Sequence, residues 1–90
     1  MAKKVIQELI FDKLKNAPSG YITTTLNVIK DLGFPTSKYS WDPIVSTIMS
    51  DIDRNGLLKP YNKKMVKLGY NKVYGRILPS TIYRIEENKQ

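Results

Sequence analysis

Three groups of helix-terminating residues divide the N-terminal part of the chain into short segments. Residues 16–20, Asn-Ala-Pro-Ser-Gly, form the first group, and Pro18 disfavours a helical conformation at the residue before it. Gly33 and Pro35 form the second group, because glycine suits a left-handed cap and proline cannot continue a helix. Residues 55–56, Asn-Gly, form the third. Every helix before residue 57 is therefore expected to be short.

Between these breaks, apolar residues recur at spacings of three and four, the pattern of a helix with one buried face. The predicted helices span residues 3–16, 24–32 and 42 to about 55. For the third helix, Asp42 is a favoured cap and Pro43 is favoured at the first helical position. Trp41 is expected to pack back against this helix. The connection before it is long enough to hold an extra turn or short helical piece at residues 36–41.

After residue 56 the pattern changes to one typical of strands. Residues 57–85 combine Tyr, Val and Ile with turn-forming residues at 69–72, so they are predicted to form a long β-hairpin. Pro60 and Pro79 are expected at strand starts, edges or bulges, because proline cannot donate to a strand ladder. Residues 21–23, Tyr-Ile-Thr, predict a short strand between the first two helices. The expected fold class is α+β.

Length and composition limit the functions that remain possible. Ninety residues are enough for one core, so residues 1–90 are expected to form a single domain with a polar tail at 86–90. The chain has no Cys and no His, which excludes zinc fingers, iron–sulfur sites, thiol redox chemistry and imidazole catalysis. Its glycines form no phosphate-binding loop, and Asp51 and Asp53 do not share a helix face. We therefore expect no enzymatic activity, metal or cofactor.

No apolar run approaches the ~20 residues that span a bilayer. No sustained apolar segment follows the first four residues, so a signal peptide is not expected either. The first predicted helix carries lysines around its apolar stripe, but that stripe is explained more simply as a core face. The sequence thus predicts a cytoplasmic protein without a membrane partner.

The positive charge is concentrated in one part of the chain. The net charge is +7, yet the first 53 residues carry six basic and six acidic side chains. Residues 54–85 carry eight Lys and Arg and no Asp or Glu, with Tyr and Asn between the cations. These residue types contact phosphates, sugars and bases. A basic hairpin of this kind predicts a polyanionic partner, with nucleic acid the first candidate.

The order helix, strand, helix, helix, hairpin over residues 3–86 resembles the winged helix-turn-helix family. The segments that carry the likeness are residues 21–24, 26–34, 48–58 and 80–85. The resemblance implies that the third helix enters the major groove of DNA and that the hairpin is the wing on the phosphate backbone. Asp51 and Asp53 lie near the end of that helix, so the wing is expected to supply most of the affinity.

The resemblance, the charges and the exposed helix face together give the candidate contact residues. On the third helix and the segment leading into it, they are Lys38, Tyr39, Ser40, Ser46, Thr47, Ser50 and Arg54. On the wing, they are Lys63, Lys64, Lys67, Tyr70, Asn71, Lys72 and Arg76. Short hydroxyl side chains allow a helix to approach base edges closely, and lysines neutralise phosphates.

The function implied is sequence-specific binding of double-stranded DNA by a small transcription regulator. The resemblance also implies a homodimer, with the first helix or the regions of Phe11 and Phe34 as contact. A plasmid or phage protein for partition or replication, which organises DNA by coating clustered sites, is equally compatible. Two alternatives use the same charge differently: RNA binding, with tyrosines stacked on unpaired bases, and a protein-interaction domain, with the hairpin on an acidic protein partner.

Overall fold

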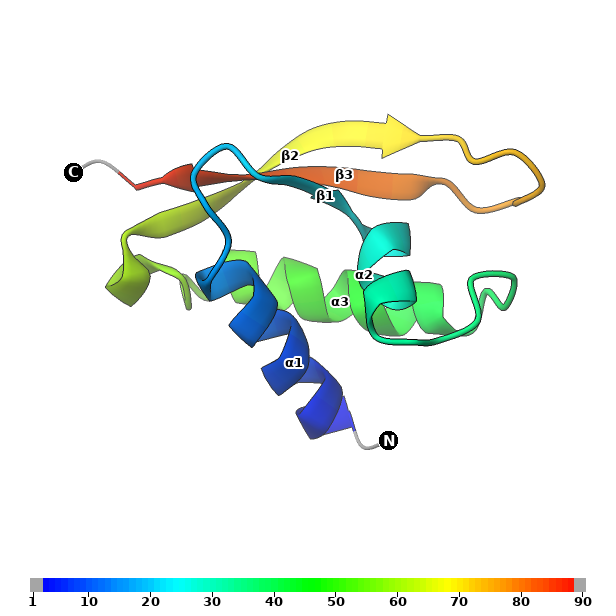
Figure 1. Cartoon of the computed structure of the whole chain (residues 1–90), viewed down its shortest axis with the longest axis horizontal. Coiled ribbons are helices and arrows are strands. Elements are labelled where there is room, and N and C mark those ends of the chain that lie inside the picture. Colours follow the sequence, from blue (N-terminus) through cyan, green and yellow to red (C-terminus); the bar gives the residue numbers. More distant parts are fainter. Residues whose placement is uncertain (1–2, 89–90) are drawn as a thin grey trace.

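A three-stranded antiparallel sheet lies over three helices in the computed structural model, which describes residues 3–88 (Figure 1). The helices are α1 (Lys3–Lys15), α2 (Thr25–Asp31) and α3 (Trp41–Arg54), with a short 3₁₀ helix η1 (Lys59–Tyr61). The strands are β1 (Ile22–Thr24), β2 (Lys63–Asn71) and β3 (Ser80–Glu87), and their order in the sheet is β1-β3-β2. The chain is therefore a small α+β domain.

The three predicted helices and the predicted short strand are confirmed, with small differences at their ends. The side chain of Thr24 accepts a hydrogen bond from the backbone N–H of Asn27 and so caps α2. The predicted capping role of Asp42 is wrong, because α3 begins at Trp41 and Asp42 lies in its first turn. The segment before α3 contains turns at residues 36–37 and 39–40 and no helix.

The predicted hairpin is confirmed, but the predicted position of its turn is wrong. Residues 69–71 belong to β2, and the connection to β3 is the loop at residues 72–79, called the wing loop below. The register shifts between Lys67, opposite Tyr83, and Gly69, opposite Ile82, so Leu68 is the extra residue of a β-bulge. Because the bulge accommodates Leu68 as an unpaired residue, β2 continues past Gly69. Gly69 has a φ of 140°, a conformation that favours glycine.

The two prolines predicted near strands behave differently. Pro79 immediately precedes β3, as expected. Pro60 instead lies in η1, before β2 begins, so the prediction for Pro60 is wrong. The 3₁₀ turn tolerates proline near its start, where a backbone N–H would have no helical partner.

The hydrophobic core lies between the sheet and the helices. Its fully buried members include Ile10, Leu14, Val28, Ile29, Val45, Ile48, Met49, Ile52 and Ile85. Phe34 and Trp41 stack with ring centroids 3.8 Å apart and an interplanar angle of 4°, at the edge of this core. The predicted packing of Trp41 against the third helix is therefore wrong: Trp41 is the first residue of α3 and stacks on Phe34 in the connection between α2 and α3. Within residues 3–88, no helix has the length and apolar character needed to cross a bilayer.

Candidate nucleic-acid interface

The polar face of α3 and the inner side of the hairpin lie next to each other. Ser46 is half-buried, and Thr47 and Ser50 are exposed. Val45, which precedes them, and Ile48, which lies between Thr47 and Ser50, are buried in the core. A shallow pocket of about 360 Å³ separates helix and hairpin. Its lining residues are Thr25, Asp42, Pro43, Ser46, Tyr70, Leu78, Pro79 and Thr81. The fold therefore brings one predicted helix hydroxyl, that of Ser46, beside one predicted wing residue, Tyr70.

Strand β2 forms an edge of the sheet and carries exposed cations. We call Lys67, Tyr70 and Asn71 of β2, together with Lys72 directly after it, the basic edge; these four residues and Lys64 are exposed. Lys67 and Tyr70 lie opposite the buried Tyr83 and Thr81 of β3, so they project toward the helix side of the sheet. Lys64 lies opposite Glu86 and projects to the other side.

Lys67 and Tyr70 are joined by a hydrogen bond. The ammonium of Lys67 donates to the Tyr70 hydroxyl at 2.7 Å and lies 4.6 Å from the ring centroid. This hydrogen bond raises the pKa of Lys67 above its usual value of 10.5. Lys67 therefore remains cationic at neutral pH, and the pair presents a charge and an aromatic ring together.

Two cations predicted to contact phosphates have partners inside the molecule. The ammonium of Lys63 donates to the backbone carbonyls of Lys15 and of Ala17, the latter at 2.6 Å. It therefore satisfies carbonyls at the end of α1, where a positive charge is favourable. Arg76 forms an ion pair with Asp42, with Nη2 and Oδ2 2.6 Å apart.

The Arg76–Asp42 ion pair connects the wing loop to the first turn of α3. The two side chains are only 6% and 11% exposed. The Arg76 guanidinium lies 4.9 Å from the ring centroid of Tyr39, and the Tyr39 hydroxyl accepts a hydrogen bond of 3.2 Å from the backbone N–H of Ile77. Tyr39, predicted as a DNA contact, therefore also positions the wing loop. Nothing in the local sequence signals this role for Asp42.

The remaining predicted residues lie at opposite ends of α3. Lys38 and Ser40 are exposed in the turns that precede the helix. Arg54 lies in the last turn, away from the wing loop, and pairs with Asp51 three residues earlier (Figure 1). The structure thus gathers the start of α3, its hydroxyls and the basic edge, and it leaves Arg54 outside this group.

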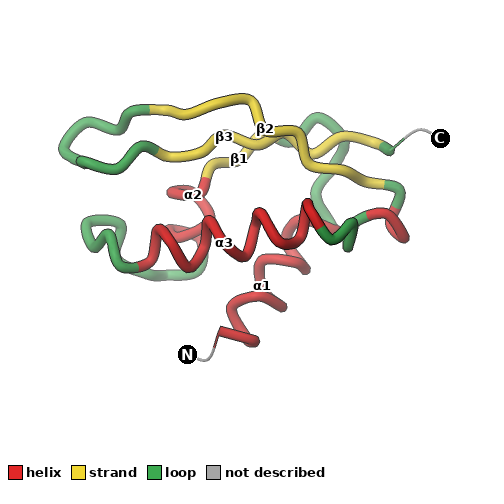
Figure 2. Tube along the Cα trace, turned by 180° about the vertical axis from the view of Figure 1, so that it is seen from behind, coloured by secondary structure: helices red, strands yellow, loops and turns green. Residues whose placement is uncertain are grey.

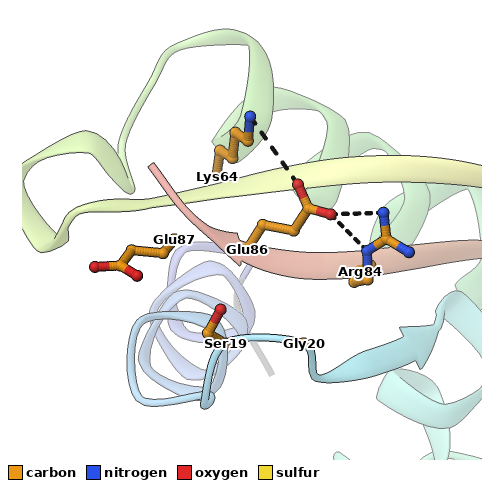
Figure 3. Close-up of a pocket in the computed structure, with 6 residues that line it drawn as sticks. All are labelled: Ser19, Gly20, Lys64, Arg84, Glu86 and Glu87. Atoms are coloured by element: carbon orange, nitrogen blue, oxygen red, sulfur yellow. Dashed lines mark hydrogen bonds and ion pairs between the residues drawn. The ribbon is translucent and has the colours of Figure 1, made fainter. Parts of the chain in front are cut away.

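A second pocket, of about 470 Å³, lies at the other end of the sheet (Figure 3). Its cations Lys64 and Arg84 both approach the carboxylate of Glu86, at 4.0 and 2.6 Å, while Glu87 points away from them. With two cations and two carboxylates, this pocket has no excess positive charge. It therefore does not extend the basic edge.

Two exposed apolar residues were not among the predicted contacts. Tyr74 and Ile77 project from the wing loop with relative exposures of 104% and 85%. The sequence gives only a weak signal that these residues are exposed, because apolar residues on both sides of Gly75 are equally typical of a buried strand.

No family model matches this chain, and no curated protein or solved structure matches it significantly.

Proposed function

We propose that this protein binds double-stranded DNA as a winged helix-turn-helix domain. In this arrangement the first half of α3 enters the major groove and the hairpin lies on the adjacent backbone. The order of elements and the strand order β1-β3-β2 are compatible with this class of domain. The proposal concerns the site rather than the fold alone, because one fold serves many functions.

One observation carries the proposal: Ser46 of α3 and Tyr70 of the basic edge line the same pocket. The Ser46 hydroxyl can donate to base edges or phosphates. Tyr70, across the pocket, accepts a hydrogen bond from Lys67, whose charge can neutralise a phosphate. DNA offers the same two kinds of group side by side, because phosphates border the groove in which base edges are exposed.

The charges indicate which part of α3 faces the groove. Asp51, which pairs with Arg54, and the exposed Asp53 both lie in the second half of the helix, so that half carries a net negative charge that would repel phosphates. The first half carries Ser46 and Thr47 instead, and Ser50 lies just beyond it. The affinity then comes mainly from the basic edge, and the sequence preference from the helix hydroxyls.

A single domain of this size contacts few base pairs, so the proposal includes a homodimer on two half-sites and a role as a regulator. Of the predicted contact regions, Phe11 and Phe34 are half-buried: Phe11 meets Tyr61 edge to face, and Phe34 stacks on Trp41. On α1, Val5 and Leu9 lie four residues apart and are 44% and 43% exposed. The α1 face is therefore the better candidate for the contact.

The test is a titration of the protein against a random-sequence DNA duplex and the matching RNA at several salt concentrations. Lys67→Ala/Lys72→Ala removes two charges from the basic edge. Lys4→Ala/Lys30→Ala removes two exposed lysines from α1 and α2 and is the matched control. We expect the dependence of log affinity on log salt to flatten by roughly 0.9 for each lost phosphate contact in the first variant, and to change little in the control.

Absence of DNA binding at ~50 mM salt, where phosphate contacts are strong, would show the proposal to be wrong. Tighter binding to the RNA would favour the RNA alternative. Equal slopes in the two variants would mean that the basic edge is not the contact surface. Selection of preferred duplexes from a random pool, followed by footprinting, would then distinguish two modes of binding. A regulator would protect paired half-sites with centres ~10 base pairs apart, whereas a DNA-organising protein would protect the DNA continuously.

A further inference from the structure

Two large apolar side chains of the wing loop, Tyr74 and Ile77, are exposed to solvent. Tyr74 is fully exposed and Ile77 is 85% exposed, which makes them the two most exposed large apolar residues of the described chain. Exposed apolar groups of this size gain free energy when a partner removes them from water. Nothing within the described chain covers them, so their placement calls for an external partner.

The loop is held in a defined position relative to α3. Its turn is closed by a hydrogen bond from the N–H of Arg76 to the carbonyl of Val73 at 3.1 Å, with Gly75 at a φ of 83°. Asp42 and Tyr39 then hold Arg76 and Ile77 from the start of α3. Both views show the loop extending past the start of the helix at one end of the molecule (Figures 1 and 2). The apolar tip is thus presented at a fixed distance from the helix.

We propose that Tyr74 and Ile77 form a wedge that enters the minor groove beside the segment contacted by α3, partly unstacks one base step and bends the DNA. This inference rests on the proposed function and adds a deformation to it. Apolar side chains inserted between base pairs kink the duplex by ~20–90°. The Tyr74 ring can stack on an exposed base face, and Ile77 can fill the opened step.

The charge around the tip favours DNA over a second copy of the chain. Lys72 flanks the tip, and residues 54–85 contain no Asp or Glu. A symmetric contact between two tips would bring like charges together, whereas the phosphates of a groove offer the complementary charge.

The size of the tip disfavours a protein partner. A stable protein interface uses roughly 20–30 residues on each side. The wing loop offers eight residues, 72–79, of which two project fully. Two side chains on a narrow loop fit the opening between two base pairs better than they fit a broad surface.

A wedge of this kind gives sequence preference without hydrogen bonds to bases. Pyrimidine–purine steps such as TA and CA unstack most readily. We therefore expect the preferred duplexes to carry such a step at a fixed distance from the positions contacted by α3.

The test uses a short duplex with donor and acceptor fluorophores at its ends and 2-aminopurine at a TA step. The full chain is compared with Tyr74→Ala/Ile77→Ala and with Ile22→Ala, which removes a 55% exposed aliphatic side chain from β1. We expect the full chain and Ile22→Ala to shorten the end-to-end distance and to raise 2-aminopurine emission. The double variant should bind with an unchanged salt dependence, since it loses no charge, and should leave the duplex straight.

Binding by the full chain with a straight duplex, or equal bending by the double variant, would overturn the wedge and leave the proposed function standing. Absence of binding by all three proteins would overturn both. Sedimentation of the proteins without DNA supplies a further check: self-association that disappears in the double variant would assign the tip to a second copy instead.

Discussion

Arg76 in the wing loop and Asp42 in the first turn of α3 form a buried ion pair, 2.6 Å between Nη2 and Oδ2. The pair joins two segments that are 34 residues apart in the sequence. The Nε and Nη1 atoms of Arg76 are buried without a hydrogen-bond partner among residues 3–88. The guanidinium therefore depends on Asp42 to compensate its charge.

Removal of Asp42 should be costly for this reason. We expect Asp42→Ala to lower the free energy of unfolding by about 3 kcal/mol, because it leaves a buried cation without its counter-ion. Urea denaturation measures this loss. The double variant Asp42→Ala/Arg76→Met should lose less than the sum of the two single variants. Additive losses would show that the pair contributes little.

The hydroxyl of Ser80 joins α2 to β3. It lies 3.0 Å from the Thr25 hydroxyl and accepts a hydrogen bond of 2.9 Å from the N–H of Leu26, and Ser80 is 1% exposed. Ser80→Ala removes the acceptor of the Leu26 N–H and leaves the Thr25 hydroxyl with the N–H of Thr81, 3.2 Å away. The substitution should lower the free energy of unfolding by about 1–3 kcal/mol. Ser37→Ala, in an exposed turn, should change it by less than ~0.5 kcal/mol. Thermal denaturation of both variants compares the two positions.

Lys63 should contribute to stability more than to DNA binding. Its ammonium is held by carbonyls at the end of α1, so Lys63→Met should lower the free energy of unfolding by about 1–2 kcal/mol. In the titration against DNA, the same variant should retain the salt dependence of the full chain. Lys72→Ala should show the opposite behaviour, with unchanged stability and a flatter salt dependence. A flatter slope for Lys63→Met would place this lysine on the DNA instead.

The bulge in β2 should make Gly69 sensitive to substitution. At a φ of 140° a side chain is strained, although no atom lies within 4 Å of the position that a Cβ would take. Gly69→Ala should therefore lower stability by about 1–3 kcal/mol through backbone strain alone. Gly33→Ala, at a φ of 81° beside open space, serves as a second glycine for comparison in the same denaturation experiment. If Gly69→Ala leaves stability unchanged, the bulge tolerates another conformation.

The helices and the hairpin could be predicted because their signals are local. The spacing of Val45, Ile48 and Ile52 identifies the buried face of α3, and Gly33 with Pro35 ends the preceding segment. The turn of the hairpin was misplaced because Gly69 and Gly75 both permit a reversal. Which of them makes it depends on the pairing of β2 with β3, where one bulged residue changes the register.

The sequence indicates which region of the chain carries the positive charge, but not which of its cations are free to contact DNA. The concentration of cations in residues 54–85 follows from the sequence alone. The sequence does not show that Lys63 binds carbonyls at the end of α1 or that Arg76 pairs with Asp42 of α3, because these partners lie 48 and 34 residues away in the chain.

The sequence by itself determined the elements, their order and the region of positive charge, because periodicity, terminating residues and composition act over a few neighbours. Only the tertiary structure decided which cations face solvent and which are bound internally. It also decided that Tyr74 and Ile77 project from an anchored loop. These outcomes depend on contacts between distant segments, whose geometry arises when the sheet packs on the helices.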